Sequence, residues 1–341
     1  MEDKVLQSVI ELPLQVEQAL KETRALRFPE TFKKIKKVLV CGMGGSRFPA
    51  LVVYHLFKKH LKVPIVVNDE YRFPSWVDKE TLVILSSYSG TTEEVLFNAK
   101  EAFEKTPFIT AITTGGKLAE FLQKRGVLFY QFNPVHNPSG QPRMGLGYAV
   151  GALAGLLENI RVLNYEYGFE EPLEFFKEQV KKIVTGEDPL SKNLAEKLYK
   201  RFPFYIVAEF LEGLGKALAN QTNETAKSIS AYHVIPELNH HLMEGLKHPE
   251  SLKKEALFVF FKSNLYHPRV QKRFSITKDV VEKNGVETLE VELKGNDILS
   301  QAFYFMGLSS HFTYLLSQKY GEEPDKIPFV DYFKKRLKEN D

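Results

Sequence analysis

Residues 81–94 read Thr81-Leu82-Val83-Ile84-Leu85-Ser86-Ser87-Tyr88-Ser89-Gly90-Thr91-Thr92-Glu93-Glu94, and they join an apolar run to a cluster of hydroxyl side chains. The apolar run predicts a buried strand over 81–86, and apolar residues recur at helical spacing from Val95 onward. The stretch therefore predicts a strand, a tight loop around Gly90 and a helix that begins near Thr92.

The loop between this strand and this helix is rich in hydrogen-bond donors. Five serine or threonine hydroxyls lie within seven residues, from Ser86 to Thr92. The open backbone N–H groups of a helix's first turn point to the same place, and such donors together suit a dianionic phosphate monoester. Ser or Thr followed by Glu is also a helix-capping signature, but a cap uses only about two hydroxyls. The loop therefore predicts phosphate binding, without the lysine that a nucleotide P-loop requires.

A second unit of strand, turn and helix lies upstream. Residues 37–40 predict a strand, Cys41-Gly42-Met43-Gly44-Gly45-Ser46 a glycine turn, and residues 49–58 a helix. Glycines let the backbone approach a ligand closely, and Ser46 at the helix start favours binding over simple packing. The third glycine directly follows the second, unlike a dinucleotide fingerprint, although Asp69 after the next strand keeps a nicotinamide cofactor as an alternative.

Strands and helices alternate through this half of the chain. Further strands are expected at 64–68, 108–113 and 127–132, and helices at 92–105 and 117–124. This alternation predicts an α/β fold with a mostly parallel, doubly wound sheet flanked by helices. Ligands of such sheets gather at the carboxyl ends of the strands. We therefore expect the turns at Gly44–Ser46, Ser87–Thr92 and Thr113–Gly115 to converge on one crevice.

Arg143 ends a loop rich in proline and glycine at 133–142 and precedes an apolar, small-residue helix predicted over 144–157. A lone arginine in such a place is more often a surface residue. Its position at the same edge of the sheet nevertheless makes it a candidate for stabilising an anion.

The alternation of strands and helices repeats after a polar, charged stretch at about 164–186. We therefore expect two domains, 1–163 with a helical N-terminal extension and the phosphate site, and 164–341 with the catalytic groups and a C-terminal helix. In the second domain we expect strands at 204–208, 232–235, 256–262 and 286–293, and helices through Lys227, near 237–246, and at 269–283, 298–320 and 327–337.

Two polar stretches of the second half could carry acid–base chemistry. Glu224 lies in a polar cluster of a predicted helix, and His240 follows a predicted strand. Proteins tune both groups toward neutrality, so one could take a proton beside a carbonyl and the other could handle hydroxyl or ring-oxygen protons. The alternatives are a surface ion pair of Glu224 with Lys227, three residues on, and a structural histidine.

Metal binding is the competing use of the histidine-rich segment. Its candidate ligands are His233, Glu237, His240, His241 and His248. A proline interrupts the segment, no His-Glu-x-x-His is present, and two adjacent histidines point to different faces of a helix. We therefore expect neither a metal nor a cofactor.

Charge and composition narrow the class of protein. The formal charge is +3 over 341 residues and lysines are interleaved with acids, so nothing supports nucleic-acid binding. The single Cys41 excludes an intramolecular disulfide and fits a reducing cytosol. The acidic start lacks a signal-peptide pattern, and no apolar run is long enough to span a bilayer. We expect a cytoplasmic protein that binds neither nucleic acid nor membrane.

Four motifs, taken together, resemble those of a known family. They are Gly42-Met43-Gly44-Gly45-Ser46, Ser87-Tyr88-Ser89-Gly90-Thr91-Thr92-Glu93, Asn223-Glu224 with Ala226-Lys227, and Glu237-Leu238-Asn239-His240. The serine loop is similar to that of the sugar isomerase (SIS) domain proteins in general. The later glutamate and Asn-His pair, sixteen residues apart (240 − 224 = 16), resemble the bifunctional phosphoglucose/phosphomannose isomerases.

The resemblance implies two SIS subdomains, a homodimer, and reversible isomerisation of glucose 6-phosphate, and of mannose 6-phosphate, to fructose 6-phosphate. By the same resemblance the substrate phosphate would be held by Gly45, Ser46, Ser87, Ser89 and Thr92. Glu224 would move a proton between C1 and C2 through a cis-enediolate, which Arg143 would stabilise. His240 of the neighbouring subunit would open the sugar ring, and Lys334 is the best match for a lysine of the family site.

The chain departs from the family pattern at two places. It has no threonine between Gly321 and Lys334, where the family carries one linked to use of the mannose epimer, and Thr91 replaces an asparagine of the serine loop. Two alternatives stay open: another SIS enzyme that isomerises a different sugar phosphate, and a sensor that binds a sugar phosphate without catalysis.

Overall fold

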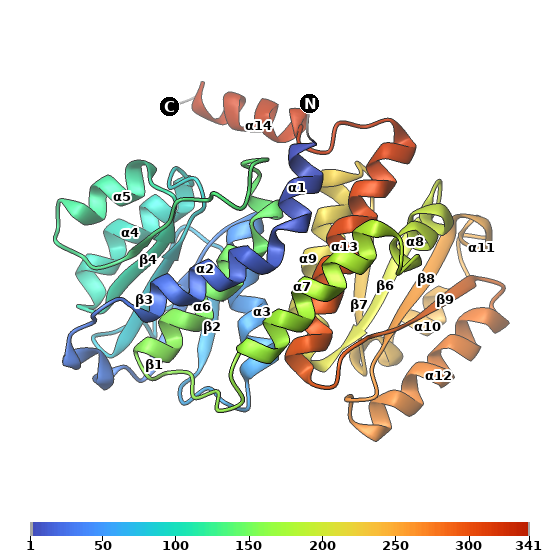
Figure 1. The fold of residues 1–341 in the computed structure, drawn as a ribbon, viewed down its shortest axis with the longest axis horizontal. Helices are drawn as coiled ribbons and strands as arrows, with labels where there is room; N and C mark the ends of the chain where they lie inside the picture. The colour runs from blue at the N-terminus through green and yellow to red at the C-terminus, as the bar shows by residue number, and fades with distance from the viewer. Residues whose placement is uncertain (1–2, 340–341) are drawn as a thin grey trace.

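The computed structural model of the chain describes residues 3–339. Within them, two β-sheets lie toward opposite ends of the long axis, with helices between and around them (Figure 1). The first sheet has the order β2-β1-β3-β4-β5 and the second the order β7-β6-β8-β9, and every pairing is parallel. The predicted α/β class with two parallel sheets is therefore confirmed. The strands are β1 (Lys37–Cys41), β2 (Ile65–Asn68), β3 (Thr81–Ser86), β4 (Ile109–Thr113), β5 (Tyr130–Gln131), β6 (Phe202–Ala208), β7 (Ala231–Ile235), β8 (Ala256–Lys262) and β9 (Glu287–Glu292).

Helices cover both sheets and fill the space between them. The α-helices are α1 (Lys4–Ile10), α2 (Leu12–Arg24), α3 (Phe48–Phe57), α4 (Glu93–Lys105), α5 (Gly116–Gln123), α6 (Leu146–Asn159), α7 (Glu170–Thr185), α8 (Leu190–Leu198), α9 (Glu212–Thr225), α10 (Leu242–Gly245), α11 (Leu252–Glu255), α12 (Pro268–Lys283), α13 (Ile298–Tyr320) and α14 (Pro328–Lys338). Short 3-10 helices are η1 (Glu30–Lys34), η2 (Gly44–Ser46), η3 (Pro142–Met144), η4 (Glu209–Leu211) and η5 (Glu237–His240).

The strand order places the expected crevice. Every residue of β3 and β4 is buried, as expected where helices cover both faces of a parallel sheet. From β1 the chain first adds β2 on one side and then returns to build β3, β4 and β5 on the other. Ligand sites of open α/β sheets lie at this reversal, outside the carboxyl ends of the strands. Here that point lies between the glycine turn after β1 and the serine loop after β3.

The glycines of α6 explain how the middle of the molecule packs. A Cβ on Gly147 would lie 2.6 Å from the carbonyl oxygen of Leu12, and one on Gly151 would lie 2.7 Å from that of Val16. The small-residue face of α6 therefore lets α2 pack with its backbone almost in contact. Tyr314 of α13 also donates a hydrogen bond to Asp3 before α1, at 2.7 Å. The N-terminal helices thus contact both halves of the chain.

Three expectations about elements need correction. The helix expected near 237–246 is wrong, because the segment forms η5 and then α10. The side chain of Asn239, in η5, donates to the hydroxyl of Thr277 of α12 at 2.7 Å. The strand expected at 127–132 shrinks to β5, since only Tyr130 and Gln131 pair with β4. The helix expected to run through Lys227 ends instead at Thr225, and helix α8 was not predicted from the sequence.

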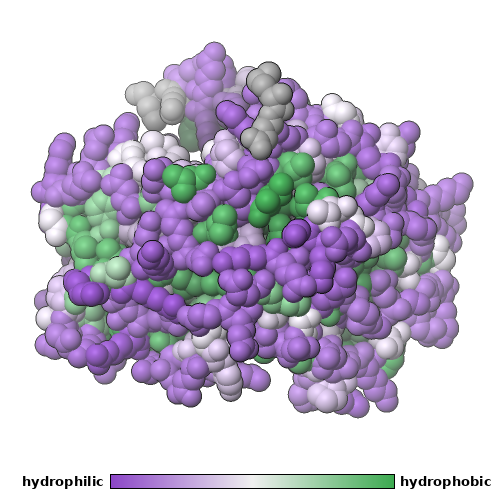
Figure 2. Space-filling view, viewed as in Figure 1, coloured by the Kyte–Doolittle hydropathy of each residue, from purple (hydrophilic) through white to green (hydrophobic). Residues whose placement is uncertain are grey.

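The surface in Figure 2 is largely polar, with apolar side chains in separate patches between charged ones. Among the described residues, no helix has the length and apolar character needed to cross a membrane.

Candidate active site

Three turns at the carboxyl edge of the first sheet meet at Tyr88. Its backbone N–H donates to the hydroxyl of Ser46 at 3.0 Å, and its carbonyl accepts from the backbone N–H and hydroxyl of Thr114 at 3.0 and 2.8 Å. Gly90 has a φ of +65°, and a Cβ there would lie 1.8 Å from the carbonyl oxygen of Gly115. The turns after β1, β3 and β4 are therefore held together, as the sequence predicts.

The serine loop points several hydroxyls at one another. The hydroxyls of Ser87 and Thr92 lie 2.8 Å apart, those of Ser89 and Thr91 lie 2.9 Å apart, and the Ser87 hydroxyl accepts from the N–H of Gly90 at 3.1 Å. Thr92 is the N-cap of α4, yet its side chain makes no capping hydrogen bond. The capping alternative depends on that bond, so the geometry favours hydroxyls and helix N–H groups that are available to an anion.

Arg143 lies beside the glycine turn and reaches the second half of the chain. It belongs to η3, whose backbone lies 3.5 Å from a Cβ built on Gly45. Its Nη1 lies 3.5 Å from Oε2 of Glu224, and its Nε donates to the hydroxyl of Thr225 at 3.3 Å. Its Nη2 donates to the carbonyl of Pro324.

Arg143 is only 3% exposed, so the expectation that a lone arginine there is a surface residue is wrong. Segments distant in sequence, at Thr225 and Pro324, wrap around the guanidinium. The surface ion pair of Glu224 with Lys227 is also wrong, since the Lys227 ammonium bonds to the carbonyl of Glu224 rather than to its carboxylate. The structure thus unites Arg143 and Glu224 next to the turn that carries Ser46.

Burial and charge act in opposite directions on this pair. Burial raises the pKa of Glu224, while Arg143, Lys334 and Lys227 oppose that shift. Burial lowers the pKa of Arg143, and the carboxylates of Glu224 and Asp325 oppose it. A carboxylate with a raised pKa is a better base once ionised, and the adjacent guanidinium can face a developing oxyanion. Lys334 is exposed on α14, but its charge reaches Glu224.

This balance predicts the pH dependence of any reaction that uses Glu224 as a base. Turnover needs the ionised carboxylate, so kcat/KM should rise with pH through a midpoint above the ordinary glutamate value of 4.5. Because Lys334 lowers the pKa of Glu224, Lys334→Met should move this limb to higher pH. The phosphate of the substrate titrates at the same pH whichever protein is assayed. The difference between the wild-type and Lys334→Met profiles therefore reports only on groups of the protein. Superimposable profiles would contradict the electrostatic role of Lys334.

His240 is not brought to this pair within the chain. Asn223, next to Glu224, accepts from the N–H of Ser230 at 3.1 Å, so the start of β7 lies beside the end of α9. His240 follows the other end of β7, whose five residues span roughly 16 Å at about 3.3 Å each. Among residues 3–339 the His240 imidazole has no hydrogen bond or ion pair, and its ring is exposed.

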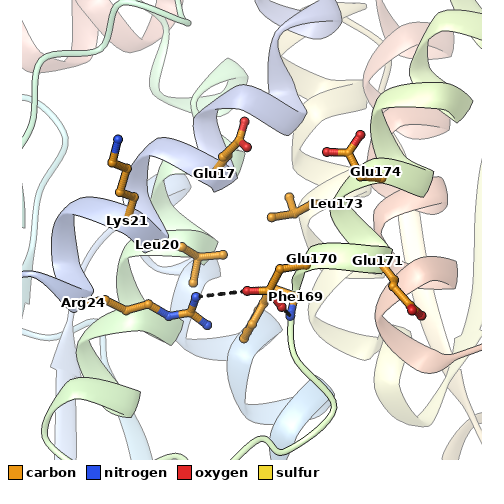
Figure 3. A pocket seen from close by; sticks show the side chains of 9 residues that line it. All are labelled: Glu17, Leu20, Lys21, Arg24, Phe169, Glu170, Glu171, Leu173 and Glu174. Carbon is orange, nitrogen blue, oxygen red and sulfur yellow. Dashed lines mark hydrogen bonds and ion pairs between the residues drawn. The ribbon is translucent and has the colours of Figure 1, made fainter.

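The other candidate ligand sites are less suited to a sugar phosphate. A groove of about 830 Å³ lies between α2 and α7 (Figure 3). Four glutamates line it against Lys21 and Arg24, and Arg24 already pairs with Glu158 and Glu170. In the part of the chain that the structure describes, no three or more His, Cys, Asp or Glu side chains are grouped as a metal site. Among the residues of the competing metal hypothesis, His241 is paired to Glu237 at 2.9 Å.

Comparison with known proteins agrees with this architecture. A family model described as the bacterial phospho-glucose isomerase C-terminal SIS domain matches residues 187–337. The solved structure of tagatose-6-phosphate ketose/aldose isomerase from Escherichia coli superimposes with a TM-score of 0.73 at 15% identity, over 96% of each chain. The two parallel sheets and the serine loop at the switch point thus define a sugar isomerase (SIS) domain protein.

Two relatives narrow the class. The bifunctional phosphoglucose/phosphomannose isomerase of Caldicellulosiruptor bescii is 31% identical over 98% of this chain and 99% of its own. That of Aquifex aeolicus is 29% identical over 89% of this chain and 91% of its own. The chain belongs to the bifunctional phosphoglucose/phosphomannose isomerase family.

Proposed function

We propose that this protein interconverts glucose 6-phosphate and fructose 6-phosphate, and mannose 6-phosphate and fructose 6-phosphate, without a cofactor or a metal. One observation carries the proposal: the buried Arg143 guanidinium lies 3.5 Å from the Glu224 carboxylate. The pair sits beside a turn whose serine contacts the serine loop. A base, a cation for an oxyanion and a phosphate anchor are what aldose–ketose isomerisation requires.

The substrate phosphate binds the serine loop and glycine turn through Gly45, Ser46, Ser87, Ser89 and Thr92. Two of these hydroxyls, Ser87 and Thr92, already form one hydrogen-bonded pair. The first-turn N–H groups of α4 add further donors, so the phosphate can be bound without a buried cationic side chain. This anchor fixes the distance from the phosphate to C1 and C2, so the same two carbons always face the base.

The Glu224 carboxylate takes the proton from C2 of the open-chain aldose and leaves a cis-enediolate, whose oxygen charge lies near Arg143. The negative charge lies first on O1, and transfer of the O2 hydroxyl proton to O1 moves it to O2. Glu224 then returns its proton to C1, and the C2–O2 bond becomes the carbonyl of the ketose. The net change moves one hydrogen from C2 to C1 and one between the two oxygens, so no redox partner is consumed. The raised pKa of Glu224 suits a group that must both accept and return a proton.

We further propose a homodimer in the cytoplasm whose two domains divide near residue 163, and in which His240 of each subunit opens the ring in the site of the other. The position of His240 at the far end of β7, exposed and without a side-chain partner among residues 3–339, supports this arrangement. Lys334, whose charge reaches Glu224, completes the set of proposed site residues.

The direct test is incubation of the pure protein with glucose 6-phosphate or mannose 6-phosphate, with fructose 6-phosphate measured and EDTA present throughout. We expect product from both aldoses, undiminished by EDTA, because no step of the mechanism uses a metal. Activity only on another sugar phosphate would favour the alternative SIS isomerase. Binding of glucose 6-phosphate without any exchange of the C2 proton into solvent would favour the sensor.

A further inference from the structure

Lys227 stands where a glycine is usual. It follows Ala226, the C-cap of α9, and has a φ of +54°. The left-handed backbone region after a helix end is normally taken by glycine, because a Cβ is strained there. Outliers of this kind persist where the surrounding structure holds them and often mark functional sites. The side chain of Lys227 therefore needs an explanation.

The ammonium group of Lys227 is fully engaged with the main chain. It donates to the carbonyl of Glu224 at 2.8 Å, to that of Thr225 at 3.4 Å, and to that of Glu323 at 2.8 Å. An ammonium group has three N–H donors, so these contacts use all of them. Two of the acceptors are carbonyls in the last turn of α9, which lack helical partners and attract a cation. The third belongs to the segment after α13.

That segment is held by a second cation. Arg143 donates from Nη2 to the carbonyl of Pro324, the residue after Glu323. Two consecutive carbonyls of the chain between α13 and α14 are thus bound by the two cations that flank Glu224. The same segment leads into α14, which carries Lys334. Its position therefore determines how the C-terminal part of the site lies against the base.

We propose that Lys227 is a positioning residue that clasps the carbonyl of Glu323 to the last turn of α9 and so holds Glu224 and the C-terminal segment in register. Its catalytic consequence rests on the proposed isomerase function. The clasp itself is a property of the unliganded chain, which makes it testable separately.

Removing the lysine also changes the charge around Glu224. The groups that face Glu224 are Arg143, Lys334 and Lys227, and each lowers its pKa. The groups that face Lys227 are Arg143, Glu322, Asp325 and Glu224. Loss of one cation should leave the Glu224 carboxylate easier to protonate, so the acidic limb of kcat/KM should move to higher pH. A lysine that only capped α9 would carry the same charge and move this limb in the same way, so amide exchange in residues 321–327 is the measurement that separates the clasp from a cap.

The experiment compares Lys227→Gly, Lys227→Met and Lys227→Arg with the wild-type protein. Lys227→Gly relieves the strained backbone and should keep the melting temperature, so misfolding does not confuse the result. In it and in Lys227→Met we expect kcat to fall about tenfold with a smaller change in KM, since a displaced base costs turnover more than binding. The acidic limb should move up in both, and Lys227→Arg should restore its position. Amide hydrogens of residues 321–327 should exchange faster without substrate.

Lys200→Gly is the matched control. Lys200 also has a positive φ, +60°, and its N–H donates to the hydroxyl of Tyr320 at 2.8 Å, a bond that glycine keeps. It should leave kcat, the acidic limb and exchange of 321–327 unchanged. Wild-type amide exchange of 321–327 in Lys227→Gly and Lys227→Met would overturn the proposal, even if the acidic limb moved. If the wild-type protein proved not to isomerise sugar phosphates, faster exchange in these variants would still support the clasp while rejecting the enzyme.

Discussion

Replacement Glu224→Gln should reduce kcat about a thousandfold or more while sugar phosphate still binds. The amide keeps the shape of the side chain and its place beside Arg143 but cannot accept the C2 proton, and loss of a general base typically costs 10²–10⁴-fold. Substrate affinity should persist because, in the proposed mechanism, the phosphate is bound by the serine loop and glycine turn, whose hydrogen bonds do not involve Glu224. The measurements are turnover to fructose 6-phosphate, exchange of the C2 hydrogen with solvent, and equilibrium binding of glucose 6-phosphate.

Glu212→Gln provides the matched control for this variant. Glu212 lies on the same helix, α9, and burial raises its pKa as well, but its carboxylate faces His55 at 3.5 Å instead of Arg143. Loss of this carboxylate should leave turnover near the wild-type value. Solvent exchange at C2 by Glu224→Gln at the wild-type rate would reject Glu224 as the base, even if the overall rate fell.

Much of the fold could be predicted because its signals are local. The buried strands of a parallel sheet are short continuous apolar runs, so β3 and β8 have the bounds that their sequences predict. The edge strand β5 was overestimated, since only two of its residues find partners on β4. The segment after Pro236 reads as one helix by composition, yet Asn239 bonds to α12 and the helix is broken there. Tertiary contacts of this kind leave no periodic signal.

The site was predictable in part for the same reason. The serine loop is a local motif, and the reversal in strand order brings it to the glycine turn. The burial of Arg143 was not predictable, because its partners come from 82 and 181 residues away. The contacts of Lys227 were missed likewise. The helix was expected to run through Lys227, whereas α9 ends at Thr225, so the place of this lysine after a helix end was not foreseen either.

Two inactive variants, Glu224→Gln and His240→Ala, should regain activity when one subunit of each is combined in a mixed dimer. If His240 acts in the site of the other subunit, Glu224→Gln and His240→Ala should each lower turnover at least a hundredfold as homodimers. A mixed dimer, obtained by co-expression with two different affinity tags, contains one site with both residues intact and one with neither. It should therefore show about half of the wild-type activity per dimer, because a two-fold interface makes the two sites equivalent. Turnover of the purified mixed dimer is the measurement.

The outcome separates the two possible arrangements because they predict different sites in the same mixed dimer. If His240 serves Glu224 of its own chain, each site lacks one of the two groups and the mixed dimer stays as inactive as its parents. The control pairs Glu224→Gln with the double variant Glu224→Gln/His240→Ala, in which no site can have the base under either arrangement. Within one chain β7 stands between the two residues and no contact joins them, so recovery in the first pair and none in the control is expected.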